Sequence, residues 1–348
     1  MLILRNTLAL LAAVLLLAPI GPGNEPAVSA NSAVLMDENA ELLYELDAHR
    51  MLPMASTTKL MTALVVIESC PLDEEVLIPA TCCGLEGSSM YLRPGESLPV
   101  RELLIGLLLE SGNDAAAALA LHCAGDLDAF AARMNRRAAE LGMRDTHFLN
   151  PHGLNEAGHY STAYDLALLM RAAMRNKTFA SLIALPSAAV GERTLNNHNK
   201  LLQRCDGCLG GKTGFTRVAG RCLVSCAERN GLRLFCVTLN DPDDWNDHIC
   251  LYDWAFSSFE ALRLDAESCR REIPLLSGGE PCAAAVPAEE ILLVLHKGAK
   301  PELSEQLPFY VFAPVAKGSP AGLLTVSEGG RLLTEIPLVY EKDYPLEW

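Results

Sequence analysis

The order of strand and helix patterns along the chain constrains its fold most strongly. A hairpin pattern comes first, with strands predicted over 32–36 and 41–45, and helical periodicity follows. A second hairpin, with strands over 220–226 and 232–239, contains an Asn-Gly turn. Because strands lie at both ends of this region and helices between them, we expect the distant hairpins to complete one antiparallel sheet with helices packed on it. The predicted fold class is therefore α/β (α+β).

The region between the hairpins is predicted to be helical. Apolar residues recur at helical spacing over 56–69, 101–110, 114–121, 126–141 and 162–175. The first of these stretches is apolar nearly all round and is followed by Pro71, which indicates a buried central helix. A last helix is expected over 245–262.

Beyond residue 271 the pattern changes again. Short apolar segments alternate with turn residues there, which is typical of an all-β module. Its strands are expected over 291–295, 309–312, 323–326 and 336–340. We predict a larger domain over 31–268 and a small β-sandwich-like domain over 269–348.

The N-terminal segment has the layout of a secretory signal peptide. One early charge, Arg5, precedes an apolar run over 8–18 that Pro19 interrupts. Small residues suit cleavage after Gly23 or after Ala30, and the sequence leaves both open; a buried helix is the alternative. We expect residues 1–30 to contain a signal peptide cleaved after residue 23 or 30, and the protein to be exported, acting at the cell wall or the outer face of the cytoplasmic membrane.

The net charge argues against nucleic acid as a partner, and the cysteine pattern argues against a metal site. The formal charge of −15, from 43 acidic and 28 basic residues, argues against nucleic acid, whose binding needs clustered Lys and Arg. Twelve cysteines are scattered mainly through apolar stretches, so we expect small buried side chains, with Cys205 and Cys208 the only pair worth testing for a bridge. No second ligand pair accompanies them, so no metal site is predicted.

Ser56-Thr-Thr-Lys59 places a hydroxyl and an amine on the same side of a predicted helix. A serine hydroxyl becomes a good nucleophile when a base takes its proton, and a lysine can act as that base once burial or a nearby cation lowers its pKa. Alone the pattern is common, and a helix start with a solvated lysine explains it equally well. The pair becomes informative only through the motifs that follow.

Two further motifs follow in the same order as in a known group of enzymes. Ser111-Gly-Asn113 lies where the helical pattern breaks, and Lys212-Thr-Gly214 begins the strand that leads to Gly220. Taken singly, the first suits an ordinary capped turn and the second a loop entering a strand. The order S-x-x-K, S-x-N, K-T-G is far more specific than any one of the three motifs.

The chain resembles the low-molecular-mass penicillin-binding proteins, the serine D-Ala-D-Ala carboxypeptidases of peptidase family S11, and in particular their sporulation-linked members. The resemblance extends to the flanking residues of Met54–Ala63, Glu110–Ala115, Asn150–Leu154, Tyr160–Ala163 and Gly210–Thr216. It covers about 32–259 and implies that 31–268 is a penicillin-binding, transpeptidase-like catalytic domain. It also implies a peptidoglycan stem peptide ending in D-Ala-D-Ala as substrate, inhibition by β-lactams, and no cofactor or metal.

The resemblance also implies roles for single residues. Ser56 is similar to the serine that forms the acyl-enzyme, Lys59 to its base, and Ser111 with Asn113 to the pair that shuttles a proton and positions substrate. Lys212 and Thr213, followed by Gly214, are similar to the groups that meet the substrate's terminal carboxylate. The implied oxyanion hole consists of the backbone N–H groups of Ser56 and Phe215.

Two departures from the family pattern bear on the carboxylate and on membrane attachment. Relatives often carry an arginine for the carboxylate, but 197–200 and 241–247 contain none, so His198 or Lys200 is expected to substitute. Relatives also commonly end in an amphipathic or apolar anchor, whereas this sequence ends in Glu341-Lys-Asp-Tyr-Pro-Leu-Glu-Trp348, so no C-terminal membrane anchor is expected.

Two rival functions remain to be weighed. A class A β-lactamase uses a glutamate, four residues ahead of an asparagine, to activate the deacylating water. Leu154-Asn-Glu-Ala157 resembles that loop, but Pro151 stands four residues before Asn155, so we expect penicillin to acylate Ser56 and leave slowly. A non-catalytic wall-binding or sensor protein is the other rival, and the retained serine and lysine favour catalysis over it.

Overall fold

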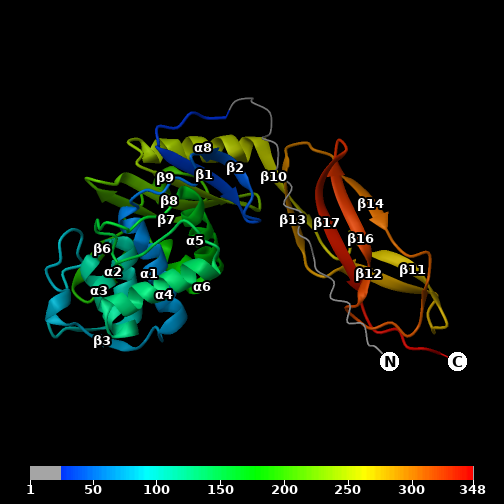
Figure 1. The fold of residues 1–348 in the computed structure, drawn as a ribbon, viewed down its shortest axis with the longest axis horizontal. Helices are drawn as coiled ribbons and strands as arrows, with labels where there is room; N and C mark the ends of the chain where they lie inside the picture. The colour runs from blue at the N-terminus through cyan, green and yellow to red at the C-terminus, as the bar shows by residue number, and fades with distance from the viewer. Residues whose placement is uncertain (1–24, 348) are drawn as a thin grey trace, which may run out of the picture.

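The computed structural model describes residues 25–347 and has two bodies, a larger α/β body and a smaller all-β body (Figure 1). The larger body contains a five-stranded antiparallel sheet in the order β2-β1-β9-β8-β7. Its strands are β1 (Ser32–Asp37), β2 (Leu42–Leu46), β7 (Cys208–Thr216), β8 (Gly220–Arg229) and β9 (Leu232–Leu239). β1 pairs with β9, so the two distant hairpins join in one sheet, and the predicted fold class is confirmed.

Both faces of this sheet are buried, which explains its nearly continuous apolar strands. In β8, Cys222 and Val224 face the helical core, whereas Leu223 and Ala227 face a second core beneath α8 (Asp244–Ser258). Figure 1 shows α8 on one side of the sheet and α1 to α6 on the opposite side. Successive side chains of a strand alternate between faces, so one strand contributes to both cores.

The helical region lies on the face of the sheet opposite α8. α7 (Leu201–Arg204) is the exception, because its Leu201 packs in the core beneath α8. The region contains the 3-10 turn η1 (Ala55–Thr58), α1 (Lys59–Ser69), η2 (Ala80–Cys82), α2 (Val100–Leu109), α3 (Asn113–Ala124), α4 (Leu127–Glu140), α5 (Ala163–Arg175) and α6 (Lys177–Ile183). Two short hairpins accompany them, β3 (Glu75–Leu77) with β4 (Ser97–Pro99), and β5 (Ser187–Val190) with β6 (Arg193–Asn196). All side chains from Lys59 to Val66 of α1 are buried, as expected for a central helix.

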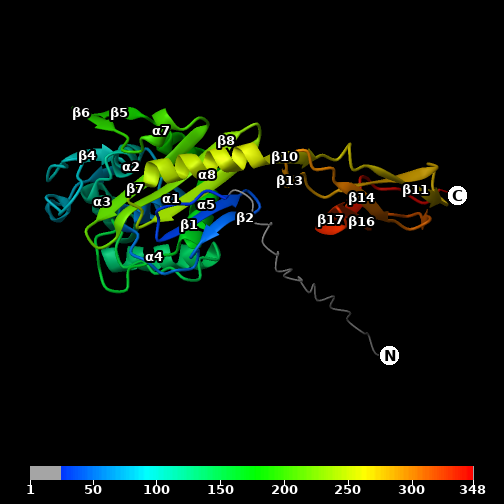
Figure 2. The same ribbon diagram turned by 90° about the horizontal axis from the view of Figure 1, so that it is seen from above.

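The predicted last helix over 245–262 is wrong at its C-terminal end. α8 stops at Ser258, and β10 (Phe259–Leu264) pairs antiparallel with β13 (Ile291–His296). Apolar residues in a short segment fit a strand as well as a helix, and here the β13 partner decides. In both views the connection between the two bodies runs through β10 and β13 (Figures 1 and 2).

The smaller body is built on a six-stranded sheet in the order β14-β16-β17-β12-β11-β15. Its strands are β11 (Arg271–Leu276), β12 (Cys282–Pro287), β14 (Glu302–Gln306), β15 (Val311–Phe312), β16 (Pro320–Glu328) and β17 (Arg331–Tyr340). A separate core that includes Leu324, Ile336 and Tyr340 supports it. Among the described residues, no single helix is long and apolar enough to cross a membrane.

The structure corrects two expectations about the cysteines. Cys205 and Cys208 are both free, whereas Cys70, just after α1, is bridged to Cys123 in α3, with Cα atoms 6.6 Å apart. Burial of Cys222, Cys226 and four other free thiols agrees with the prediction of small buried side chains, whereas Cys250 is exposed and Cys83, Cys208 and Cys282 are half-buried. The bridge was not predicted because its partners are 53 residues apart in sequence and meet only through helix packing.

Candidate active site

Ser56 lies in the 3-10 turn that precedes α1. The hydroxyls of Thr57 and Thr58 donate to the carbonyl oxygens of Met54 and Ala55, at 2.7 and 2.8 Å, and these bonds hold the turn. Ser56 remains partly exposed while its neighbours on both sides are buried. The turn therefore presents one hydroxyl from a buried segment.

Lys59 is completely buried beside Ser56. Its Nζ lies 2.9 Å from the Oγ of Ser56, 2.7 Å from the Oδ1 of Asn113 and 2.6 Å from the carbonyl oxygen of His152. Burial holds the pKa of Lys59 well below its ordinary value, and repulsion from Lys212 lowers this pKa further. A lysine with a lowered pKa is neutral over more of the physiological pH range and can accept a proton.

Asn113 begins α3 and is fixed on both sides. Its Nδ2 donates to the carbonyl oxygen of Glu86 at 2.6 Å, which leaves its Oδ1 directed at Lys59. Ser111 precedes it with a φ of 62° and is 4% exposed. Within residues 25–347 the Oγ of Ser111 has no hydrogen-bond partner. A buried hydroxyl without a partner is costly unless something else, such as a substrate, supplies one.

The Lys212-Thr-Gly214 motif lies on β7, the edge strand of the sheet. A Cβ on Gly214 would come within 3.1 Å of the backbone nitrogen of Ser56, so a larger residue would push the strand and the serine turn slightly apart. Lys212 is 1% exposed, and burial lowers its pKa to about 7. Its Nζ donates to the carbonyl oxygen of Thr213 at 3.1 Å.

These segments enclose a cleft of about 330 Å³, here called the active-site cleft. Its lining residues are Ser56, Ser88, Ser111, His198, Lys200, Thr213, Gly214, Phe215, Arg221, Asp244 and Trp245. Of the predicted residues, Lys59, Asn113 and Lys212 are buried and do not line the cleft directly. The residues Ser88, Arg221, Asp244 and Trp245 were missed, because the sequence gives no sign that they meet the motifs in space.

The loop 150–154 completes the surroundings of Lys59. Besides the carbonyl of His152, it presents the carbonyl of Pro151 to the hydroxyl of Thr62 at 2.6 Å. A Cβ on Gly153 would lie 1.9 Å from the carbonyl oxygen of Ala55, so the loop packs directly on the serine turn. The family-like pattern at 150–154 pointed to this loop, but not to the backbone atoms that it supplies.

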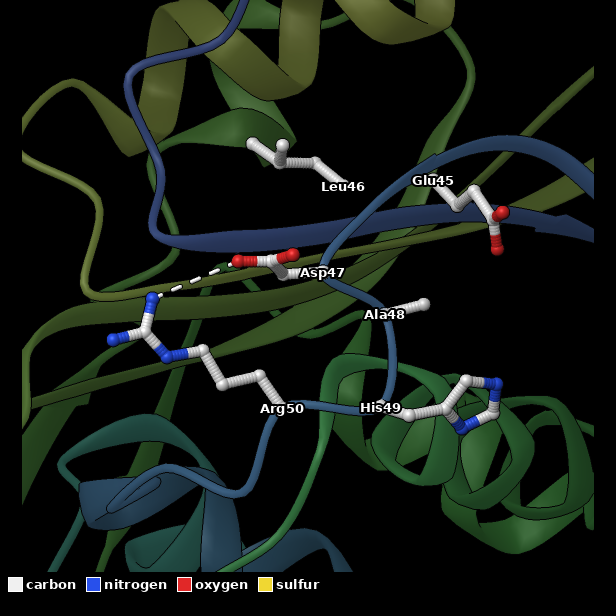
Figure 3. Close-up of a pocket in the computed structure, with 6 residues that line it drawn as sticks. All are labelled: Glu45, Leu46, Asp47, Ala48, His49 and Arg50. Atoms are coloured by element: carbon white, nitrogen blue, oxygen red, sulfur yellow. Dashed lines mark ion pairs between the residues drawn. The ribbon is translucent and has the colours of Figure 1, made fainter.

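A second hollow lacks the features of a ligand-binding site. It is lined by the continuous segment 45–50, in which the exposed Asp47 and Arg50 form an ion pair at 3.7 Å (Figure 3). No side chain from another element converges on it. Among the described residues there is also no group of three or more His, Cys, Asp or Glu that could hold a metal ion.

A cleft in which a serine hydroxyl is bonded to a buried lysine amine, at the edge of an antiparallel sheet, defines a serine enzyme of the acyl-transfer class. The model of the D-alanyl-D-alanine carboxypeptidase family, peptidase S11, matches residues 22–243, and this chain belongs to that family.

Individual relatives agree with this assignment. The D-alanyl-D-alanine carboxypeptidase DacF of Bacillus subtilis is 30% identical over 92% of this chain and 87% of its own length. DacB2 of Mycobacterium tuberculosis, of the same activity by name, is 38% identical over 69% of this chain and 86% of its own. The crystal structure of penicillin-binding protein 5 from Haemophilus influenzae superimposes with a TM-score of 0.83 and 27% identity, over 93% of this chain and all of that one.

Proposed function

We propose that this chain is a serine D-Ala-D-Ala carboxypeptidase that removes the terminal D-Ala from peptidoglycan stem pentapeptides through an acyl-enzyme on Ser56. The observation that carries the proposal is the 2.9 Å contact between the Oγ of Ser56 and the fully buried Nζ of Lys59. We further propose that the protein acts outside the cytoplasm, where such a substrate is found.

The surroundings of Lys59 suit a neutral amine. A neutral amine has two N–H donors and one lone pair. The Oδ1 of Asn113 and the carbonyl of His152 accept the two donors, which leaves the lone pair for the hydroxyl of Ser56. Lys59 therefore takes the proton of Ser56 as its oxygen attacks the penultimate D-Ala carbonyl.

The tetrahedral intermediate then collapses to the acyl-enzyme. Its oxyanion accepts hydrogen bonds from the backbone N–H groups of Ser56 and Phe215. The C–N bond breaks, and the proton held by Lys59 passes through Ser111 to the leaving D-Ala amine. Water then attacks the ester, with Lys59 again as base, and releases the tetrapeptide and the free serine. An amine in place of water would give a cross-linked product by the same route.

Substrate binding along β7 is consistent with the fold. One edge of β7 is unpaired in the sheet, so an extended peptide can add to it as a further strand. Gly214 leaves room for the peptide beside Ser56. Thr213 lines the same cleft and offers a hydroxyl donor.

Fast β-lactam hydrolysis is disfavoured by the groups around the cleft. Asp244 is the only carboxylate among the cleft-lining residues of 25–347, and it is ion-paired with Arg221 at 2.7 Å. Pro151 stands where a class A β-lactamase would carry its water-activating glutamate, and its carbonyl is bonded to Thr62. Rapid turnover of a chromogenic cephalosporin would favour the β-lactamase alternative instead.

The direct test of the proposed activity is release of D-Ala from diacetyl-Lys-D-Ala-D-Ala. We expect the wild-type protein to release D-Ala and Ser56→Ala to lose the activity, by at least about 10³-fold. Ser257→Ala, on α8 away from the cleft, is the matched control and should retain the activity. No release by the wild-type protein would favour the non-catalytic alternative.

A further inference from the structure

We propose that Arg221 binds the terminal carboxylate of the substrate, and that Asp244 positions its guanidinium for this task. The inference rests on the proposed carboxypeptidase activity and names the residue that replaces the arginine missing from 197–200 and 241–247. Arg221 lies on β8, outside both of those stretches.

The sheet register places Arg221 in the cleft. Arg221 is the Cα partner of Phe215 across the β7–β8 ladder, and Thr213 lies two residues before Phe215 on β7. Directly opposed residues of an antiparallel pair, and residues two apart on one strand, share a face of the sheet. Arg221 therefore projects on the same side as the Thr213 side chain, and both line the cleft that contains Ser56.

The guanidinium of Arg221 is held by Asp244 and Trp245 and remains partly exposed to solvent. Its Nη2 donates to the Oδ1 of Asp244 at 2.7 Å, and it lies 5.7 Å from the centre of the Trp245 ring. The side chain of Asp244 is 2% exposed, whereas that of Arg221 is 42% exposed, so the cation is on the solvent side of the pair. Within 25–347, Nη1 of Arg221 makes no hydrogen bond. A donor thus remains available for a carboxylate.

The other cationic side chains in or near the cleft are less suited to bind the substrate carboxylate. Lys212 is 1% exposed and does not line the cleft, and burial lowers its pKa to about 7. The Nε2 of His198 lies 3.3 Å from the carboxylate of Glu110, so this nitrogen already faces an anion of the protein itself. Lys200 is exposed, where solvent weakens its attraction for an anion. An arginine stays charged and can bind a carboxylate through two parallel hydrogen bonds.

A pair of thioester substrates tests the assignment. Both carry the same acyl D-Ala group, and the leaving group is thioglycolate in one and thioglycolamide in the other, so they differ only in the carboxylate. We expect Arg221→Gln to lower the carboxylate-to-carboxamide ratio of kcat/KM about 10–100-fold, the usual range for one charge-assisted hydrogen-bond pair. Arg221→Lys should restore part of the ratio, because it returns the charge without the planar fork.

Matched variants separate this role from general damage. Arg229→Gln removes another arginine of β8, which pairs with Asp253 away from the cleft, and should leave the ratio unchanged. If Arg221→Gln fails to fold, Asp244→Asn is the deciding variant. It removes the charged partner that positions the guanidinium and should lower the same ratio of kcat/KM by a smaller factor. A wild-type ratio in both Arg221→Gln and Asp244→Asn, or its loss in Lys200→Gln or His198→Gln instead, overturns the inference. A wild-type protein that cleaves neither thioester contradicts the proposed function itself.

Discussion

At the scale of single residues, we propose that the protonation state of Lys59 determines whether Ser56 is activated. Burial is the main cause of its lowered pKa, and the buried Lys212 adds repulsion. Asn113 and His152 direct the amine through hydrogen bonds at 2.7 and 2.6 Å. The proposed nucleophile and its proposed base thus depend on three segments that are distant in sequence.

The rate of acylation should therefore depend on pH in a defined direction. Only neutral Lys59 accepts the serine proton, so kcat/KM should rise with pH through the pKa of Lys59 and then level off. In Lys212→Gln the repulsion is absent, the charged form of Lys59 is less disfavoured, and its pKa rises. We expect the acid limb of the profile to move to higher pH in this variant, whatever the change in its height.

A stopped-flow profile of penicillin acylation between pH 5 and 9 measures this shift. Lys177→Gln removes an exposed lysine from α6 and serves as the control, with the limb in its wild-type position. An acid limb that stays in place or moves to lower pH in Lys212→Gln would show that Lys212 does not tune the base.

The site shows which residues could be predicted and which could not. Ser56 and Lys59 were predicted because their spacing on one turn brings them together whatever the rest of the fold. The carbonyl of His152 was not, since a backbone atom leaves no signal of its own in the sequence. Arg221 was missed for a different reason: only the β7–β8 register places it opposite Phe215.

At the scale of elements, the loop 150–154 and the serine turn form one packed unit. Gly153 has a φ of +84°, and a Cβ there would meet the carbonyl oxygen of Ala55 at 1.9 Å. Gly142 has a similar φ of +79°, but a Cβ there would meet nothing within 4 Å. The two glycines thus separate backbone strain from steric overlap.

We expect Gly142→Ala to cost about 1 kcal/mol of stability from the left-handed backbone alone. Gly153→Ala should cost more, about 2–4 kcal/mol, and should also slow acylation of Ser56, because the overlap displaces the loop that holds Lys59. Urea unfolding and the penicillin acylation rate measure the two effects. Equal effects of both substitutions would mean that the loop does not position the site.

Elements were predicted better where periodicity was long. The helices around 126–141 and 162–175 were found nearly at their true ends, because each shows a clear apolar face and an N-capping residue, Asp126 or Thr162. The segment 259–262 was misassigned because its pairing with β13 is a long-range contact. The short hairpin of β5 and β6 was missed because strands of four residues carry little pattern.

At the scale of the whole molecule, hydrogen bonds tie the start of the described chain to Asp241, just before α8, and to Asp247 in its first turns. The backbone nitrogen of Ser29 donates to the Oδ2 of Asp247 at 2.6 Å, and its hydroxyl lies 2.9 Å from the Oδ1 of Asp241. Both aspartates are buried, and burial raises the pKa of Asp241 to about 6. Without Ser29 two buried carboxylates would lose donors.

We therefore expect processing of the exported protein to leave Ser29 in place, with cleavage after Gly23 favoured over cleavage after Ala30. The expected signal peptide lies, up to residue 24, outside the described residues. Intact mass and N-terminal sequencing of the secreted protein decide between the two sites. A mature chain that begins at Asn31 would contradict the expectation.

Of the two bodies, only the α/β body carries residues of the active-site cleft. All residues that line the active-site cleft lie between Ser56 and Trp245, in the α/β body, while the smaller sheet has its own core. We propose that the division falls near the predicted boundary at 268 and 269, with β10 and β13 linking the bodies. We therefore place the whole of the proposed chemistry in the cleft, with Ser56 as its nucleophile.

Mass spectrometry of the protein after exposure to benzylpenicillin tests that claim most directly. We predict that the intact mass rises by one penicillin molecule, that the adduct lies on the peptide containing Ser56, that it persists for many minutes, and that Ser56→Ala lacks it. An unmodified protein, or an adduct on any other residue, would contradict the assignment of Ser56 as the nucleophile.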